Sequence, residues 1–351
     1  MRPAMIPLIA MFILCSVSSI VGCGGNASIL SQSISASISS QSTLKPQNGP
    51  ERSACSSASA PPPPAANYGL SVLAFCDDFD STSTIDIKGT GIAGFQWYTN
   101  LPFGWGKTKP PAFTISQSVL TVTSSVKGSN WALTTRDPIT GNGNSWRFGY
   151  FEARISFNPG LVSQSAAWPA FWGMSSNKLQ HNDIREYSEL DFFEALVVSE
   201  EHVDGFLGTI HDWQDGMNID YFNQNDWQET HTDWSQWHTV GVLWVPGSVT
   251  WYLDGNPLMS QLYWSNSGPS PSAIGANVVY PTPPGIFSNI DDDPMGQQIV
   301  IGSDPNWPLM IDWVRVWSWW PDSCFPQRTE YDFRIQEGAE RCRGASTREG
   351  S

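Results

Sequence analysis

The sequence predicts an all-β fold, a β-sandwich jelly roll of two packed antiparallel sheets with one concave face that can hold a linear polymer. Three observations lead to this prediction. Many short segments alternate with a period of two or run through β-branched and aromatic side chains. Turn signals such as Pro246-Gly247 and Asp254-Gly255 separate these segments. No window holds an apolar helical stripe over three turns.

The clearest strand patterns lie between about Tyr68 and Trp320, and turn signals separate them. Two further turn signals are Gly141-Asn142-Gly143 and Asn158-Pro159-Gly160. The expected strands are residues 120–123, 150–157, 237–245, 249–253 and 310–317.

The folded domain is expected to span residues 67–320, because the flanking sequences cannot build a core. Residues 1–22 are typical of a signal peptide, with one early charge and an apolar run that is too short and too rich in Ser to span a membrane well. Residues 23–66 are rich in Ser, Ala and Gln and end in four prolines, which is typical of a linker. Residues 321–351 form a polar tail.

The end of the predicted signal peptide, Ile20-Val21-Gly22-Cys23, resembles a bacterial lipobox. Lipidation of Cys23 would hold the protein on a membrane surface through acyl chains. We therefore expect an exported protein, either a cell-envelope lipoprotein at the outer membrane or cell surface, or a secreted one if the signal is simply cleaved. The membrane would be contacted only through the lipid anchor.

Four cysteines remain when Cys15 and Cys23 are set aside, which is an even number in an exported protein. They are Cys55, Cys76, Cys324 and Cys342. Two disulfides are expected, and three pairings are open. A bridge from Cys76 to Cys324 is preferred here, because it would join the two ends of the domain and staple the tail.

The charge balance excludes several classes of partner. Eighteen Lys and Arg stand against 33 Asp and Glu, a formal net charge of −15. Such a chain has no basic surface for a phosphate backbone, so nucleic acid is excluded. A strongly anionic polymer is disfavoured as well. Eighteen Trp residues instead favour a sugar-binding protein, because indoles offer broad flat faces.

Three acidic residues fall within one apolar strand, residues 187–196. Glu189 and Asp191 are two apart and share a face, whereas Glu194 is out of phase by one residue. A β-bulge around Phe192-Phe193 would bring Glu194 onto the same face, and bulges are common beside active sites. Crowded carboxyls raise the proton affinity of at least one member. A retaining glycosidase needs such a set, with one ionised nucleophile and one protonated acid. The alternatives are a charged edge strand or a calcium site.

The segment Glu189-Leu-Asp191-Phe-Phe-Glu194 resembles the E-x-D-x-x-E signature of glycoside hydrolase family 16, in its bulged form. Further blocks resemble the family in order and spacing over about 250 residues. They are Phe75-Cys-Asp-Asp-Phe79, Gly149-Tyr-Phe-Glu-Ala-Arg154, Trp168-Pro-Ala-Phe-Trp172, His211, Trp237–Trp244, Val249–Gly255 and Ile311–Trp317. The resemblance implies a jelly roll that cleaves β-linked glucans or galactans with retention.

The resemblance also implies roles for residues. Glu189 would be the nucleophile, Glu194 the acid and base, and Asp191 the group between them that helps to set both protonation states. Substrate-binding candidates are Trp168, Trp172 and His211, with Trp131, Trp97 and Trp213 as further stacking candidates, each of which packing explains better. Asp312 matches a position that often contributes to a structural calcium site, so calcium is a candidate ligand, and no other cofactor is expected.

We therefore expect a monomeric endo-acting glycoside hydrolase that degrades a neutral polysaccharide, with β-1,3- or mixed β-1,3/1,4-glucan favoured. The loop from Gln180 to Ser188 lacks the Trp of many laminarinase-like members, which weakens the choice of substrate. The alternatives are an agarase or galactanase, a transglycosylase on the same scaffold, and a non-catalytic carbohydrate-binding jelly roll.

Overall fold

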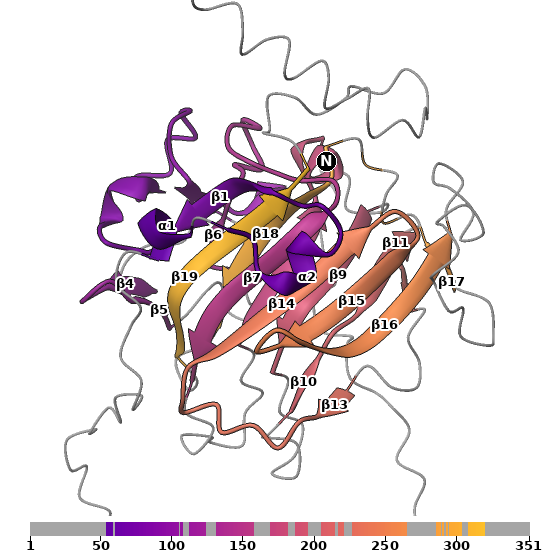
Figure 1. Ribbon diagram of the computed structural model, residues 1–351. Coiled ribbons are helices and arrows are strands. Elements are labelled where there is room, and N and C mark those ends of the chain that lie inside the picture. The colour runs from indigo at the N-terminus through magenta and orange to yellow at the C-terminus, as the bar shows by residue number, and fades with distance from the viewer. Residues whose placement is uncertain are drawn as a thin grey trace, which may run out of the picture. The chain divides into compact units, whose positions relative to one another are not determined.

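Two large β-sheets make up the fold, as the all-β prediction requires (Figure 1). The computed structural model describes residues 54–58, 60–104, 106–107, 112–123, 131–157, 169–181, 187–195, 205–214, 217–220, 227–264, 286–288, 290, 293, 295–303 and 308–319. The predicted signal peptide (1–22), the lipidation candidate Cys23, most of the predicted linker and the tail (321–351) lie outside this part of the chain.

The first sheet has nine strands within the described residues, in the order β17-β16-β15-β14-β7-β19-β5-β4, with β1 paired to β19. Its neighbours are antiparallel except for the β16–β17 pair. The five strands expected from the sequence all lie here. The strands are β1 (Val72–Asp77), β4 (Phe113–Ile115), β5 (Leu120–Val122), β7 (Gly149–Ser156), β14 (His238–Val245), β15 (Ser248–Leu253), β16 (Asn256–Trp264), β17 (Ile286–Phe287) and β19 (Leu309–Ser318).

The second sheet has ten strands within the described residues and contains the three acids. Its order is β12-β11-β9-β8-β18-β6-β3-β2, with β10 beside β9 and β13 beside β10, and the β2–β3 pair is parallel. The strands are β2 (Ile85–Asp86), β3 (Trp97–Tyr98), β6 (Leu133–Thr134), β8 (Ala170–Ser175), β9 (Tyr187–Glu194), β10 (Gly205–Leu207), β11 (Ile210–Gln214), β12 (Met217–Asp220), β13 (Trp227–Glu229) and β18 (Gln297–Gly302).

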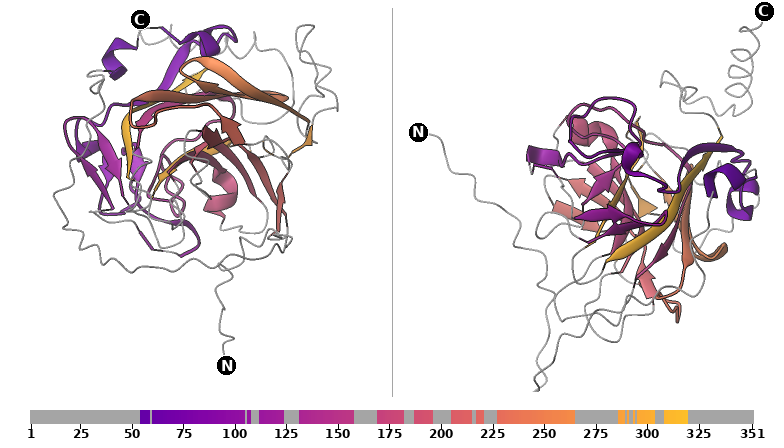
Figure 2. Two further views of the ribbon diagram at one scale, coloured as in Figure 1. Left: turned by 90° about the horizontal axis from the view of Figure 1, so that it is seen from below. Right: turned by 90° about the vertical axis from the view of Figure 1, so that its left-hand side faces the viewer.

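The main hydrophobic core lies between the two sheets, which Figure 2 shows as stacked layers. Alternate residues of β7, Phe151 and Ala153 among them, face residues of β8 and β9. The rings of Phe151 and Phe192 stack with centroids 4.8 Å apart and connect the layers directly. A strand whose alternate residues face the core between two sheets is the arrangement expected of a β-sandwich.

Helices are few and short in the described residues, as the missing helical periodicity predicted. They are α1 (Ala54–Ser57), α2 (Pro63–Ala66), α3 (Ser176–Gln180) and the 3₁₀ segments η1 (Thr82–Thr84) and η2 (Pro102–Gly104). Within the described part, none of these helices has the length and apolar character needed to cross a membrane.

The folded structure begins earlier than residue 67. Helices α1 and α2 fall within the predicted linker and pack against β19 and β7 on the outer face of the nine-stranded sheet (Figure 1). Ala65 and Leu70 are fully buried there in a cluster with Tyr150 and Trp317. The boundary placed at residue 67 is therefore too late, because the prolines that suggested a linker also start helix α2.

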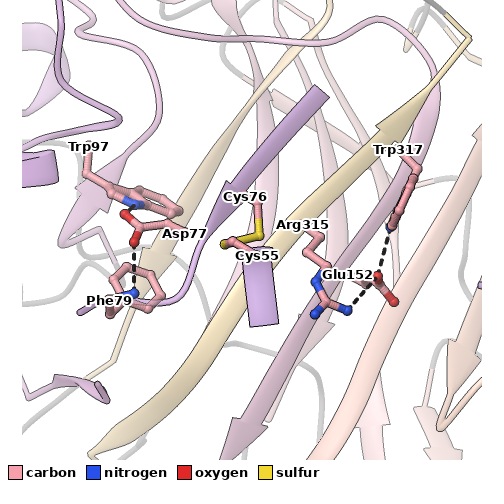
Figure 3. Close-up of a disulfide and its surroundings, with 8 residues drawn as sticks. All are labelled: Cys55, Cys76, Asp77, Phe79, Trp97, Glu152, Arg315 and Trp317. Carbon is pink, nitrogen blue, oxygen red and sulfur yellow. Dashed lines mark hydrogen bonds and ion pairs between the residues drawn. A yellow bond between two sulfur atoms is a disulfide. The ribbon is translucent and has the colours of Figure 1, made fainter. Parts of the chain in front are cut away.

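The disulfide in the described residues joins Cys55 to Cys76, with Cα atoms 5.6 Å apart (Figure 3). The preferred pairing of Cys76 with Cys324 is therefore wrong. Helix α1 packs against β19, the strand that pairs with β1, and this brings Cys55 next to Cys76. The contact could not be read from a segment taken as a linker. Cys324 and Cys342 lie outside the described residues.

Removing this disulfide is expected to lower the free energy of unfolding by about 3 kcal/mol, because it closes a loop with a sequence separation of 21. For a domain of this size, Tm should fall by roughly 6–12 °C. Thermal unfolding of wild type and the C55S/C76S variant, each with and without reductant, measures the effect. Reductant should not change the Tm of the variant. An unchanged wild-type Tm under reductant, or a peptide map that links Cys76 to another cysteine, would contradict the assignment.

Candidate active site

Strand β9 contains the β-bulge that the sequence predicted. Its pairing with β8 runs regularly from Glu189 opposite Met174 to Asp191 opposite Trp172, and then shifts register between Trp172 and Phe171. Phe193 pairs with Phe171, so Phe192 is the extra residue on β9. One residue inserted between Asp191 and Glu194 restores the phase of the second glutamate.

The bulge places all three carboxylates on the same face of the ten-stranded sheet. Directly opposed residues of an antiparallel pair share a face, and Glu194 pairs with Ala170. Ala170, Trp172 and Met174 belong to one apolar cluster, separate from the core between the sheets. The intervening residues Leu190, Phe192 and Phe193 belong to that core. The acids therefore lie on the outer face of the ten-stranded sheet.

The backbone of the bulge is fixed from both sides. The Asp191 N–H donates to the carbonyl oxygen of Thr209 at 2.9 Å. Its own carbonyl accepts the indole N–H of the fully buried Trp251, which belongs to β15 of the other sheet, at 2.7 Å. Gly208 makes room for that indole, because a Cβ there would lie 2.3 Å from Trp251 Nε1. The carbonyl oxygen of Asp191, beside the bulge, thus receives its hydrogen bond from a side chain of the other sheet.

Replacing Trp251 by Phe should lower both stability and activity. The variant leaves the Asp191 carbonyl buried without this donor, which costs about 1–3 kcal/mol. The matched control is Trp244→Phe, which removes the donor of another buried indole hydrogen bond, to Tyr263 Oη at 2.9 Å, away from the bulge. Both variants should lose Tm, but only Trp251→Phe should lose kcat in the folded enzyme. Equal kcat values for the two variants would show that this hydrogen bond does not position the acids.

Strand β11 supplies two side chains to the acids. His211 stands directly opposite Glu189 and contacts Asp191, two residues further along β9. Trp213 stands directly opposite Tyr187 and contacts Glu189, again two residues further along. His211 Nε2 lies 2.9 Å from Asp191 Oδ2. The indole N–H of Trp213 donates to Glu189 Oε2 at 3.0 Å. The sequence-predicted His211 therefore joins the acids, in contact with Asp191.

Burial, together with the negative charge of Asp191, raises the pKa of Glu189 to about 8. The charge of His211 and the hydrogen bond from Trp213 act in the opposite direction. The predicted role of Glu189 as nucleophile requires its ionised form, so a proton on this carboxyl must leave before attack.

Glu189, Asp191 and His211 also offer ligand atoms within 4.8 Å of one another, a spacing that suits a metal ion. However, Trp213 donates to one of these acids and His211 lies against the other. Such contacts are the ones expected when carboxylates are kept for proton transfer and nucleophilic attack.

The Trp residues that the sequence suggested for sugar binding lie in different parts of the fold. Trp172 and Trp131 lie on the same face as the acids and pack edge to face with ring centroids 5.6 Å apart. Their exposed fractions are 5% and 1%, so in this structure neither offers a fully open ring for stacking. The buried Nε1 of Trp172 finds no hydrogen-bond partner within the described residues. Trp168 lies outside the described residues.

Trp97 is a core residue, so its assignment as a sugar-stacking residue is wrong. Its ring is fully buried between the sheets and packs against Phe75 and Phe79. Its indole N–H donates to Asp77 at 2.9 Å (Figure 3). The strand containing Trp97 turns this side chain inward, which residue type alone does not reveal.

Asp312, the calcium candidate, lies on β19 of the other sheet and forms an ion pair with Arg154. It is 1% exposed. A guanidinium thus already balances the carboxylate charge, and calcium at this position stays a prediction.

Two residues of the site were not anticipated as such. Tyr187 stacks on Trp213, and its position two residues before Glu189 was a usable signal because side chains alternate along a strand. Trp251 carries no such signal, since it reaches Asp191 from the other sheet, 60 residues away in the chain.

Comparison with known proteins gives a family match: the model for "Glycosyl hydrolases family 16" matches residues 112–273. A search of curated proteins found no match.

Solved structures similar to this chain include three glycan-degrading enzymes. The laminarinase from Flavobacterium sp. UMI-01 has 16% identity over 70% of this chain and 100% of that chain, with a TM-score of 0.44. The laminarinase from Rhodothermus marinus has 18% identity over 71% and 97%, with a TM-score of 0.41. The kappa-carrageenase from Pseudoalteromonas carrageenovora has 16% identity over 69% and 92%, with a TM-score of 0.40.

Proposed function

We propose that this chain, a glycoside hydrolase whose residues 112–273 match the model for glycosyl hydrolases family 16, is a retaining endo-β-glycanase acting on a neutral polysaccharide. The observation that carries this proposal is the bulge at Phe192, which puts Glu189, Asp191 and Glu194 on one face. A sequence that merely placed charges along an edge strand would not need this bulge.

The proposed reaction has two displacements at the anomeric carbon. In the first, a carboxylate oxygen of Glu189 bonds to that carbon, while Glu194 gives its proton to the departing glycosidic oxygen. In the second, Glu194 takes a proton from water, and the resulting hydroxide displaces Glu189 from the same carbon. Two inversions give net retention, and both carboxyls return to their starting states.

Asp191 lies between the two glutamates in the strand and is fully buried. Its charge favours a proton on Glu189 in the resting enzyme. We propose that His211 holds Asp191 in this position, at 2.9 Å. Glu189 releases its proton to solvent before attack and takes one up again after it has been displaced.

The charge of the chain supports a neutral substrate. Residues 67–320 contain 10 Lys and Arg against 26 Asp and Glu, and such a surface repels sulfated polymers. β-1,3-Glucan and mixed β-1,3/1,4-glucan are the favoured substrates, with agarose as the alternative.

The purified protein should be incubated with laminarin, lichenan, agarose and xyloglucan, and its products separated by size. An endo-acting enzyme releases oligosaccharides of many lengths early in the reaction. We expect this result with laminarin or lichenan as the substrate. Proton NMR of the first products should show the β anomer before mutarotation. An initial α anomer would overturn retention, products longer than the substrate would indicate transglycosylation, and binding without cleavage would leave a carbohydrate-binding protein.

Export and lipidation at Cys23 belong to the proposal and rest on the sequence. In a bacterial host, the full chain should fractionate with membranes and carry acyl chains detectable by mass spectrometry. The variant Cys23→Ser should lose both properties, whereas Cys15→Ser, within the apolar run, should keep them. Equal fractionation of all three proteins would contradict lipidation.

A further inference from the structure

Trp213 is, we propose, a positioning residue for the nucleophile Glu189 and not a stacking platform for a sugar. This inference rests on the proposed function, because it assigns Trp213 a part in the same reaction. Trp213 was a candidate for sugar stacking from the sequence, and the structure assigns its polar edge to the acid.

The first observation is the contact itself. The indole N–H of Trp213 donates to Glu189 Oε2 at 3.0 Å. An indole donates and never accepts, and it does not titrate in the range of enzyme activity. Trp213 therefore presents the same donor to Glu189 at every working pH.

The second observation is the support of the ring. Tyr187 stands directly opposite Trp213 in the β9–β11 pair, and the two rings stack with centroids 5.2 Å apart and planes 22° apart. Cross-strand aromatic pairs of this kind stabilise a sheet and restrict both side chains. The orientation of the N–H is thus fixed before substrate arrives, so that little reorganisation is needed at the moment of reaction.

The groups facing Glu189 explain why such a donor is needed. Two further acids lie on its own strand, Asp191 and the more distant Glu194. The negative charge of Asp191 opposes ionisation of Glu189. On β11, His211 favours ionisation when it is protonated. On β8, the residue opposite is Met174, which carries no charge. Trp213 is the neutral, pH-independent donor in this set, and it stabilises the ionised form that attacks.

The test compares Trp213→Phe with wild type by the pH dependence of kcat and kcat/KM on a glucan substrate. Phe keeps an aromatic ring against Tyr187 and removes only the donor. We expect kcat to fall by about 10- to 100-fold, the loss of a charge-assisted hydrogen bond, with KM changed little. The acidic limb of kcat/KM should move to higher pH, because Glu189 without this donor holds its proton more tightly.

Two further variants separate positioning from structure. Tyr187→Phe keeps the stacked ring and should leave the acidic limb in place. Replacement of Trp213 by β-(3-benzothienyl)alanine, which has the shape of Trp with sulfur in place of N–H, should reproduce the Phe variant even if Phe destabilises the sheet. A rise in KM with an unmoved acidic limb would overturn the proposal and return Trp213 to sugar stacking.

The variant Glu189→Gln distinguishes failure of this inference from failure of the proposed function. If Glu189→Gln is inactive while Trp213→Phe keeps wild-type kcat and pH profile, only the role of Trp213 is wrong. If Glu189→Gln retains wild-type activity, the proposed nucleophile is wrong, and the role of Trp213 falls with it.

Discussion

Replacing either Glu189 or Glu194 by Gln should lower kcat by more than about a thousandfold. Gln keeps the shape of Glu, but it can neither form a stable glycosyl ester nor exchange a proton with the leaving oxygen. Both side chains lie on the outer face of the ten-stranded sheet and not in the core between the sheets. The fold should therefore survive, and thermal unfolding should show Tm values at or above that of wild type. Turnover of laminarin or lichenan measures the loss.

Chemical rescue distinguishes the two roles. With an activated aryl glycoside and azide, Glu189→Gly should form the α-glycosyl azide, because azide attacks directly from the face of the missing nucleophile. Glu194→Gly should form the β-glycosyl azide, because the glycosyl-enzyme still forms and azide then displaces Glu189. If either Gln variant keeps near-normal activity, the assignment of that residue fails. Azide products of the opposite configuration would exchange the two roles.

The second large effect is expected for Asp191→Asn. The charge of Asp191 helps to raise the pKa of Glu189, so its removal should lower that pKa. Glu189 must be ionised to attack. A lower pKa therefore extends activity to more acidic conditions, and the acidic limb of kcat/KM should move to lower pH. At the pH optimum, kcat should fall by about 100-fold, because Asn places no ionisable carboxyl between the two glutamates.

This shift is opposite in sign to the one expected for Trp213→Phe, and the pair of variants forms an internal control. Both should keep the fold, as judged by Tm and by the far-ultraviolet spectrum. His211 and Glu194 also face this group of acids, so the alkaline limb should be recorded in the same experiment. An acidic limb that stays in place for Asp191→Asn would show that this charge does not govern ionisation of Glu189.

Much of the fold could be predicted from local sequence. Segments such as 249–253 alternate cleanly and are bounded by Pro246-Gly247 and Asp254-Gly255, and β15 occupies almost the same residues. Side-chain alternation is a property of each strand alone, so it can be read without a partner. The same reasoning located the bulge, because three acids spaced by two and then three residues can share a face only if one residue is extra.

Long-range contacts could not be predicted in this way. Cys55 pairs with Cys76 because α1 packs against β19, the strand that pairs with β1, although the surrounding residues resemble a linker. Trp97 was assigned to sugar binding, yet its strand turns the ring between the sheets. In both cases the local sequence is compatible with either state, and the choice depends on which surface lies opposite.

The sequence by itself determined the all-β class and the acid strand, because these follow from alternation within a few residues. It also required one extra residue in that strand if the three carboxyls were to share a face. The tertiary structure decided which groups meet those carboxyls. Trp251 holds the bulge from the other sheet, His211 lies against Asp191, and Trp213 donates to Glu189. These contacts depend on strand order and register, which are set by packing of distant segments and not by the period of any one strand.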